Sequence, residues 1–267
     1  MTPNNIDDLI HLSLFGDRED DIAWKAVRQL HTIGDQEVLE KAIELTRSQD
    51  PLRRARGADI LGQLGVRAQP STLFVSERLQ RLIELLRDEV DPLVLDAAIV
   101  ALGHLREPEG IREILRYKNH PDENVRYAVA WALPGGQSES AEVIETLLSL
   151  MRDSDSDVRD WATFGLGTQS EADSPAIREA LFERLQDQDE DTRAEAAVGL
   201  ARRNDKRVLP ILLEELARDE YGALYEEAAS SLLGLDAVRP DGWESWRYIK
   251  ELRKHFNVQD STDGPAQ

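Results

Sequence analysis

The sequence predicts an all-α fold, an α-solenoid of about seven stacked two-helix repeats. Three observations predict it: a short frame of residues recurs along the chain, each copy has the apolar periodicity of a helix, and a second helical pattern follows most copies. A fixed period of roughly 20–50 residues is typical of repeat architectures, whose units stack on their neighbours in chain order. The periodicity therefore decides the fold class before any single element is considered.

The recurring frame is an amphipathic helix. Its copies begin at residues 19, 50, 91, 122, 155, 189 and 221. Counting the first residue as slot 0, every copy has leucine at slot 11, a small residue or valine at slot 7, and most have an apolar residue at slot 3. Spacings of 3, 7 and 11 lie on one helical stripe. Most copies start with an aspartate that can cap the helix, and four carry an arginine at slot 4 that can pair with a neighbouring acid.

A second helix is expected after the frame, with examples at 36–48, 76–88, 141–153, 175–187 and 206–219. Neither helix can bury its apolar face alone, so neighbouring units must share one continuous core. We therefore expect a single domain over 1–256, with capping helices near 4–14 and 241–256, and a disordered tail at 257–267. The second repeat is longer than the others because it holds 66–76, which is either a binding loop or a plain insertion.

The frame D-x-x-V-R-x-x-A-x-x-A-L-G, followed by a second helix, resembles HEAT-like repeats of the bacterial phycobilin-lyase type. The resemblance covers about residues 17–256 and departs most at the ends, where Glu19 and Tyr221 replace the capping aspartate. Such departures are expected of terminal repeats, which have only one neighbour. The resemblance implies a binding scaffold in most members of this family, alongside some bilin lyases and a few enzymes.

The net charge of the chain limits the classes of partner that it can bind. Acidic residues outnumber basic ones 52 to 32, which gives a net charge of −20. Such a field repels nucleic acid and anionic membranes and steers a basic partner toward the chain. The chain has no cysteine, its first residues lack the pattern of a signal peptide, and it has no long apolar stretch. These features predict a cytoplasmic protein that neither binds nucleic acid nor enters a membrane.

No catalytic, cofactor or metal site is predicted. The five histidines show no i, i+4 pair and no His-Glu dipeptide, so the iron site that HEAT-repeat metal hydroxylases form with His-Glu pairs is not expected. The sequence also lacks a phosphate-binding glycine loop and a Gly-x-Ser-x-Gly elbow. We interpret the acidic runs at repeat junctions as helix caps, because they lack the spaced ligands and the glycine of a calcium loop.

A partner-binding patch is predicted on the face of the first helices opposite the core, at slots 5 and 9, together with Trp161 at slot 6 on the flank nearest a neighbouring helix. Its candidate residues share an apolar or aromatic side chain in the central copies: Val100, Tyr127, Trp131, Trp161, Phe164 and Val198. Contiguous exposed apolar residues usually mark an interaction site, and aromatic residues are favoured anchors. The alternative is that these side chains fill grooves between repeats, which is favoured for Trp161 and left open for Trp131 and Phe164.

The functional prediction is a non-enzymatic scaffold or adaptor that binds another protein, with a basic partner favoured by the charge. Binding would use either a concave surface formed by the second helices or the central aromatic patch. Two alternatives stay open: a bilin lyase or chaperone-like lyase subunit, and an acidic inhibitor or immunity-type protein. The identity of the partner and the oligomeric state do not follow from the sequence.

Overall fold

A computed structural model of the protein describes residues 5–65, 73–134, 140–220, 222–235 and 243–258. Over these ranges the chain forms α-helices and short helical turns with no strand, which confirms the predicted all-α solenoid class. The chain divides into two compact units, Met1–Ser138 and Glu139–Gln267, which we call unit 1 and unit 2 and describe separately. The expectation of one continuous domain over 1–256 stays a prediction.

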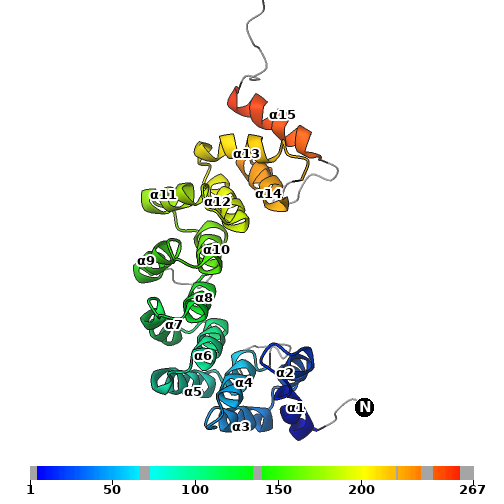
Figure 1. Cartoon of the computed structure of the whole chain (residues 1–267), viewed down its shortest axis with the longest axis vertical. Coiled ribbons are helices and arrows are strands. Elements are labelled where there is room, and N and C mark those ends of the chain that lie inside the picture. Colours follow the sequence, from blue (N-terminus) through cyan, green and yellow to red (C-terminus); the bar gives the residue numbers. More distant parts are fainter. Residues whose placement is uncertain (1–4, 66–72, 135–139, 221, 236–242, 259–267) are drawn as a thin grey trace, which may run out of the picture. The chain divides into compact units, whose positions relative to one another are not determined.

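Unit 1 contains two rows of helices (Figure 1). The first-helix row, formed by the recurring frame, consists of α2 (Asp21–Ile33), α4 (Pro51–Gly62), α6 (Pro92–Leu105) and α8 (Glu123–Ala132). The second-helix row consists of the cap α1 (Ile6–Ser13), α3 (Gln36–Leu45), α5 (Val75–Asp88) and α7 (Pro108–Ile114), which ends in the 3-10 turn η1 (Leu115–Tyr117).

Unit 2 repeats this arrangement. Its first-helix row consists of α10 (Ser156–Phe164), α12 (Glu190–Arg202) and α14 (Ala223–Leu232). Its second helices are α9 (Ala141–Leu150), α11 (Pro175–Arg184) and α13 (Leu209–Glu215), which the 3-10 turn η3 (Lys206–Val208) precedes. A π-helical turn, η2 (Gly165–Gln169), extends α10, and α15 (Ser245–Phe256) follows α14.

The first helices begin where the frame predicts. The aspartate at slot 0 has an extended backbone, and its carboxylate accepts backbone N–H groups of the first turn in five copies: Asp50, Asp91, Asp122, Asp155 and Asp189. This is the usual role of an aspartate N-cap. The terminal copies differ. Asp20, not Glu19, caps α2, and Gly222 begins α14 without a side-chain cap.

This one-residue shift of the first copy overturns one core assignment. The frame places Ile22 on the apolar stripe, but its side chain is 51% exposed, and the neighbouring Ala23 is fully buried. Because the helix is capped by Asp20, one residue after Glu19, the residues that face the core move by one position around the helix. The last copy shows the same shift, because Leu224 is only half-buried and Tyr225 is fully buried. The slot-11 residues are all buried: Leu30, Leu61, Leu102, Leu133, Leu166, Leu200 and Leu232.

The arginine at slot 4 binds the loops that border its own repeat. In four copies its Nη1 donates to two carbonyls of the loop that precedes its own helix: Arg54, Arg126, Arg159 and Arg193. Two of these arginines also pair with an acid just before the next copy, as the sequence predicts. Arg54 contacts Glu89 at 2.7 Å, and Arg159 contacts Asp187 at 2.8 Å. The Arg54 and Arg159 guanidiniums therefore join the start of a repeat to the end of that same repeat.

Small residues bring the first helices of each unit close together. A Cβ atom on Gly103 of α6 would lie 2.7 Å from the Cβ atom of Ala132 in α8, and one on Gly199 of α12 would lie 2.7 Å from the Cα atom of Gly167. In each unit, taken by itself, the first-helix row lies on the inner side of the bend (Figure 1). The expectation that second helices form the concave surface is therefore wrong within each unit, because the row with the smaller contact residues packs more tightly.

Two buried arginines hold the loops after first helices. Arg78 of α5 donates to the carbonyl oxygens of four residues around the end of α4: Leu61, Gly62, Leu64 and Leu73. Arg203 does the same in unit 2, where its acceptors around η2 include the carbonyls of Leu166 and Gly167. Burial lowers the pKa of both guanidiniums. These side chains satisfy carbonyl groups that a helix end leaves without a partner.

Two predicted segments fall largely outside the described residues. Of the long insertion 66–76, residues 66–72 are not described, and α5 begins directly after Phe74, which has a left-handed backbone. Of the predicted tail 257–267, residues 259–267 are not described. The capping helices near 4–14 and 241–256 correspond to α1 and α15.

Candidate protein-binding surface

The six predicted patch residues lie on the first-helix rows, but the two units hold them separately. Unit 1 carries Val100 on α6 and Tyr127 and Trp131 on α8, and all three are half-buried. Unit 2 carries Trp161 and Phe164 on α10, both half-buried, and Val198 on α12. The structure therefore brings each set of three into the first-helix row of its own unit.

Val198 does not belong to an exposed patch. Its side chain is fully buried, and Asp59 and Ser230, which occupy the same slot 9 in other copies, are only 8% and 5% exposed. The helical wheel treats the face opposite the core as open, but first helices of neighbouring repeats pack against both flanks. The prediction of a solvent-facing slot 9 is wrong at these three positions for that reason.

The Trp131 ring occupies the groove between α6 and α8. It makes an edge-to-face contact with His104 of α6, with ring centroids 4.9 Å apart, and it covers Gly103, whose hypothetical Cβ would lie 3.3 Å from the indole. His104 Nε2 lies 2.6 Å from Nε2 of Gln63, and burial lowers the pKa of His104 to about 4. The indole therefore fills a gap that a glycine leaves, while part of it stays in contact with water.

The aromatic residues of unit 2 form a pair. Trp161 and Phe164 pack edge to face with their ring centroids 5.6 Å apart, and each keeps part of its surface in water. Aromatic pairs in this arrangement are favourable beyond their buried area. The pair is thus a rigid apolar platform on α10.

Two carboxylates next to this platform lack a cationic partner among the described residues. Asp160 precedes Trp161 on α10, and Glu195 lies on the adjacent helix α12. Burial, followed by the nearby acid Asp189, raises the pKa of Asp160 to about 6. Burial and the charge of Asp160 raise the pKa of Glu195 to about 7, although the Thr168 hydroxyl donates to it at 3.2 Å.

Asp160 is the less satisfied of the two, because its Oδ1 atom is buried without a hydrogen-bond partner. An ionised carboxylate removed from water and left unpaired costs free energy. Sequence reasoning missed both acids, since it took slot 5 to face solvent and considered only Trp161 at slot 6. The available signal was the recurrence of acids at these slots in neighbouring copies, as in Asp96, Asp160, Glu195 and Glu227.

Unit 1 holds comparable acids on its first-helix row, and there an arginine neutralises them. Arg18, from the loop between α1 and α2, pairs with Asp59 of α4 at 2.9 Å and also with Asp96 of α6. Arg56 contacts Asp59 at 3.2 Å and lies over the Trp24 ring, 5.2 Å from its centroid. The Arg18 guanidinium thus bridges carboxylates of two neighbouring first helices, while a second guanidinium, that of Arg56, contacts one of these carboxylates and lies over an aromatic ring.

The residues that the structure describes hold neither a candidate metal site nor a candidate membrane span. No group of three or more His, Asp or Glu side chains there could hold a metal ion. In the same ranges, no helix combines the length and the apolar character that crossing a bilayer requires.

Comparisons with known proteins agree with the architecture. The structure of Escherichia coli YibA is similar at 28% identity and a TM-score of 0.70, over 94% of this chain and 93% of that one. An archaeal HEAT-like repeats protein from Thermococcus onnurineus is similar at 19% identity and a TM-score of 0.54, over 90% of this chain and all of that one (100%). A chain of the S. pombe condensin Cnd3–Cnd2 subcomplex is similar at 17% identity and a TM-score of 0.61, over 98% of this chain and 46% of that one.

Comparison with curated protein sequences finds no match. The HEAT repeats family matches residues 79–167 and 144–233, which together span more than half of the 267 residues. Solenoids of this kind are repeat scaffolds, and their stacked helices offer extended surfaces for binding. The chain belongs to the HEAT-repeat family.

Proposed function

We propose that the chain is a HEAT-repeat adaptor that binds a basic segment of another protein through the first-helix row of unit 2. The binding surface, which we call the acidic-aromatic face, consists of Asp160, Trp161, Phe164 and Glu195. The observation that carries the proposal is the pair of half-buried carboxylates on α10 and α12, for which the described part of the chain supplies no cation.

The energetic argument concerns the charge of the two acids. At neutral pH a second ionised carboxylate beside Asp160 is disfavoured by burial and by repulsion, and both raise the pKa of Glu195. A cation from a partner would convert that repulsion into attraction. Close opposite charges at protein interfaces can be clearly favourable when both are desolvated. The net charge of −20 adds long-range attraction for the same partner.

Unit 1 supplies an internal precedent for the chemistry of the partner. The guanidinium of Arg18 spans Asp59 and Asp96 on neighbouring first helices, and Arg56 stacks against Trp24. An arginine is suited to such a place because its planar fork binds carboxylates and its flat face stacks on aromatic rings. We therefore infer that arginine side chains of the partner bind Asp160 and Glu195, with Trp161 or Phe164 beneath them.

The test is binding of a fluorescently labelled oligo-arginine peptide, measured by anisotropy. Asp160→Asn/Glu195→Gln should weaken binding about tenfold, since losing close charge pairs at an interface costs ~1.4 kcal/mol or more. The matched control is Glu142→Gln/Glu145→Gln, which removes two exposed acids from α9 of the same unit. If both double variants weaken binding equally, only general charge attraction is at work, and the acidic-aromatic face is not the binding site.

An acidic inhibitor or immunity-type protein that covers a basic partner would be a special case of this function, and the same experiment applies to it. No observation on the described residues favours a bilin lyase. Covalent transfer of a bilin to an acceptor protein in the presence of this chain would support the lyase alternative over the adaptor.

A further inference from the structure

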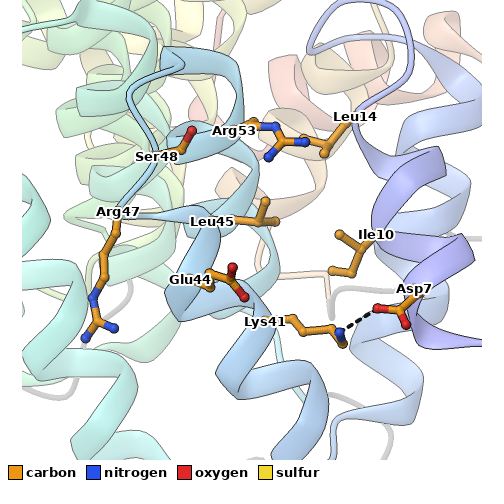
Figure 2. Close-up of a pocket in the computed structure, with 9 residues that line it drawn as sticks. All are labelled: Asp7, Ile10, Leu14, Lys41, Glu44, Leu45, Arg47, Ser48 and Arg53. Carbon is orange, nitrogen blue, oxygen red and sulfur yellow. Dashed lines mark hydrogen bonds and ion pairs between the residues drawn. The ribbon is translucent and has the colours of Figure 1, made fainter.

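A cavity of about 490 Å³ lies at the N-terminal end of unit 1, between α1 and α3 (Figure 2). Ligand sites in proteins have volumes of roughly 300–1,000 Å³ and combine apolar walls with a few polar groups. This cavity is remote in sequence from the acidic-aromatic face, because all its lining residues precede residue 54.

The walls of the cavity are apolar. Ile10 of α1 and Leu45 of α3 point toward one another across it, and Leu14 continues the α1 wall (Figure 2). Leu45 is only 6% exposed, so it belongs to the floor, whereas Ile10 and Leu14 are half-buried. An aliphatic chain laid along these three side chains would remove more apolar surface from water.

The two ends of the cavity differ in charge. At one end Lys41 pairs with Asp7 across the gap, and the charges of Asp7 and Glu44 also raise the pKa of Lys41. The charge of Lys41 is therefore already neutralised by Asp7, and Glu44 adds a negative charge. Two acids and one lysine leave no attraction for a further anion there.

At the other end, Arg53 and Ser48 have unused donors. The exposed Arg53 guanidinium lies beside Leu14 (Figure 2), and it makes no hydrogen bond or ion pair with the described residues. The Ser48 hydroxyl oxygen accepts the N–H of Asp50 at 3.2 Å, so its own hydrogen can still donate to a ligand. A guanidinium and a hydroxyl next to an apolar wall are suited to a carboxylate that carries a hydrocarbon chain.

We propose that this cavity binds a small amphipathic carboxylate. The carboxylate accepts hydrogen bonds from Arg53 and Ser48, and its aliphatic chain lies along Leu14, Ile10 and Leu45 toward the Lys41–Asp7 end. A chain of −20 net charge repels free anions, so the apolar walls must supply part of the binding energy. Because the polar donors lie at one end and the apolar walls follow, tight binding requires both the carboxylate and the aliphatic chain of the ligand.

Titration calorimetry of the full chain with sodium octanoate tests the proposal. We expect a dissociation constant on the order of 1 mM for so small a ligand. Arg53→Gln should weaken binding about tenfold by removing a charge-assisted hydrogen bond. Arg28→Gln, which changes an exposed arginine of α2 that does not line the cavity, should leave binding unchanged.

Two further ligands separate the halves of the proposed interaction. Acetate, which lacks the chain, and 1-octanol, which lacks the charge, should each bind at least tenfold more weakly than octanoate. The proposal is overturned if octanoate gives no saturable heat, if octanol binds as tightly as octanoate, or if Arg53→Gln and Arg28→Gln behave alike. Asp160→Asn/Glu195→Gln should bind octanoate normally, so this result is independent of the proposed adaptor function.

Discussion

The stability of unit 2 should depend on pH through the two unpaired carboxylates of the acidic-aromatic face. The perturbation is Asp160→Asn/Glu195→Gln, which keeps the shape of both side chains and removes their charge. The pKa of Asp160 rises from 3.8 to about 6 in the folded chain, and that of Glu195 from 4.5 to about 7. A folded chain that raises the pKa of an acid binds its proton more tightly, so ionisation of that acid weakens folding.

The magnitude follows from the same values. At 1.36 kcal/mol per pKa unit, ionising either acid in the folded chain costs ~3 kcal/mol. Because both side chains keep part of their surface in water and the two acids titrate together, we expect about 3 kcal/mol for the pair. The destabilisation is absent below the ordinary pKa values near 4, grows as the pH rises, and is complete above about pH 7. The double variant should therefore match the wild type at pH 4 and be more stable at pH 8.

The assay is thermal unfolding followed by circular dichroism from pH 4 to 8, with the wild type as reference. The effects of all other acids are the same in both proteins, so they cancel when the melting temperature of the wild type is subtracted from that of the double variant at each pH. At pH 8 the double variant should melt roughly 6–12 °C higher than the wild type. Glu142→Gln/Glu145→Gln, which removes the same formal charge from exposed positions on α9, should follow the wild type across the range. A double variant that is no more stable at pH 8, or whose advantage does not change with pH, would refute the reasoning.

Three further predictions concern packing and binding. Arg78→Ala should lower the free energy of unfolding, measured by chemical denaturation, by about 3 kcal/mol, because it leaves buried carbonyls unpaired. Arg112→Ala on the surface of α7 should change this free energy little. Gly103→Ala should lower the free energy of unfolding by about 2 kcal/mol, because the new Cβ atom forces α6 and α8 apart. Gly222→Ala should be tolerated in the same measurement, because the nearest atom to its new Cβ atom lies 3.9 Å away. Trp131→Ala should lower the melting temperature, because the indole fills the groove between α6 and α8, and should leave binding of the basic peptide to unit 2 unchanged; weakened binding at an unchanged melting temperature would place Trp131 in a binding surface instead.

The sequence predicts the fold well because the repeat frame is a local pattern that occurs several times. The aspartate caps and the leucine stripe each depend on one helix and its immediate neighbours, so the structure confirms them copy by copy. The frame fails only where a copy has diverged, as at Ile22, whose helix begins one residue later than the frame implies. One sequence cannot show which of two adjacent acids, Glu19 or Asp20, will cap the helix.

The surface was harder to predict, because burial at slots 5 and 9 depends on the neighbouring helix. Val198 is enclosed where α12 has close first-helix neighbours on both sides, while Phe164 at the same slot stays half-buried on α10. The distance between first helices is set by small residues at their contacts, such as Gly167 and Gly199, which belong to different copies. A helical wheel for one copy contains no information about that distance.

The contrast between the two units shows why the acids of unit 2 stand out. Both rows carry carboxylates on neighbouring first helices, as expected of related repeats with the same frame. In unit 1 the loop before α2 places Arg18 between Asp59 and Asp96, and this contact is possible only because the terminal copy leaves that loop beside the row. Asp160 and Glu195 lie on inner copies, where the preceding loop is bound by a slot-4 arginine such as Arg159 to its own repeat. The chain therefore closes one acidic face with its own arginine, whereas the described residues supply no cation to the other, and under the proposed function a partner would supply it.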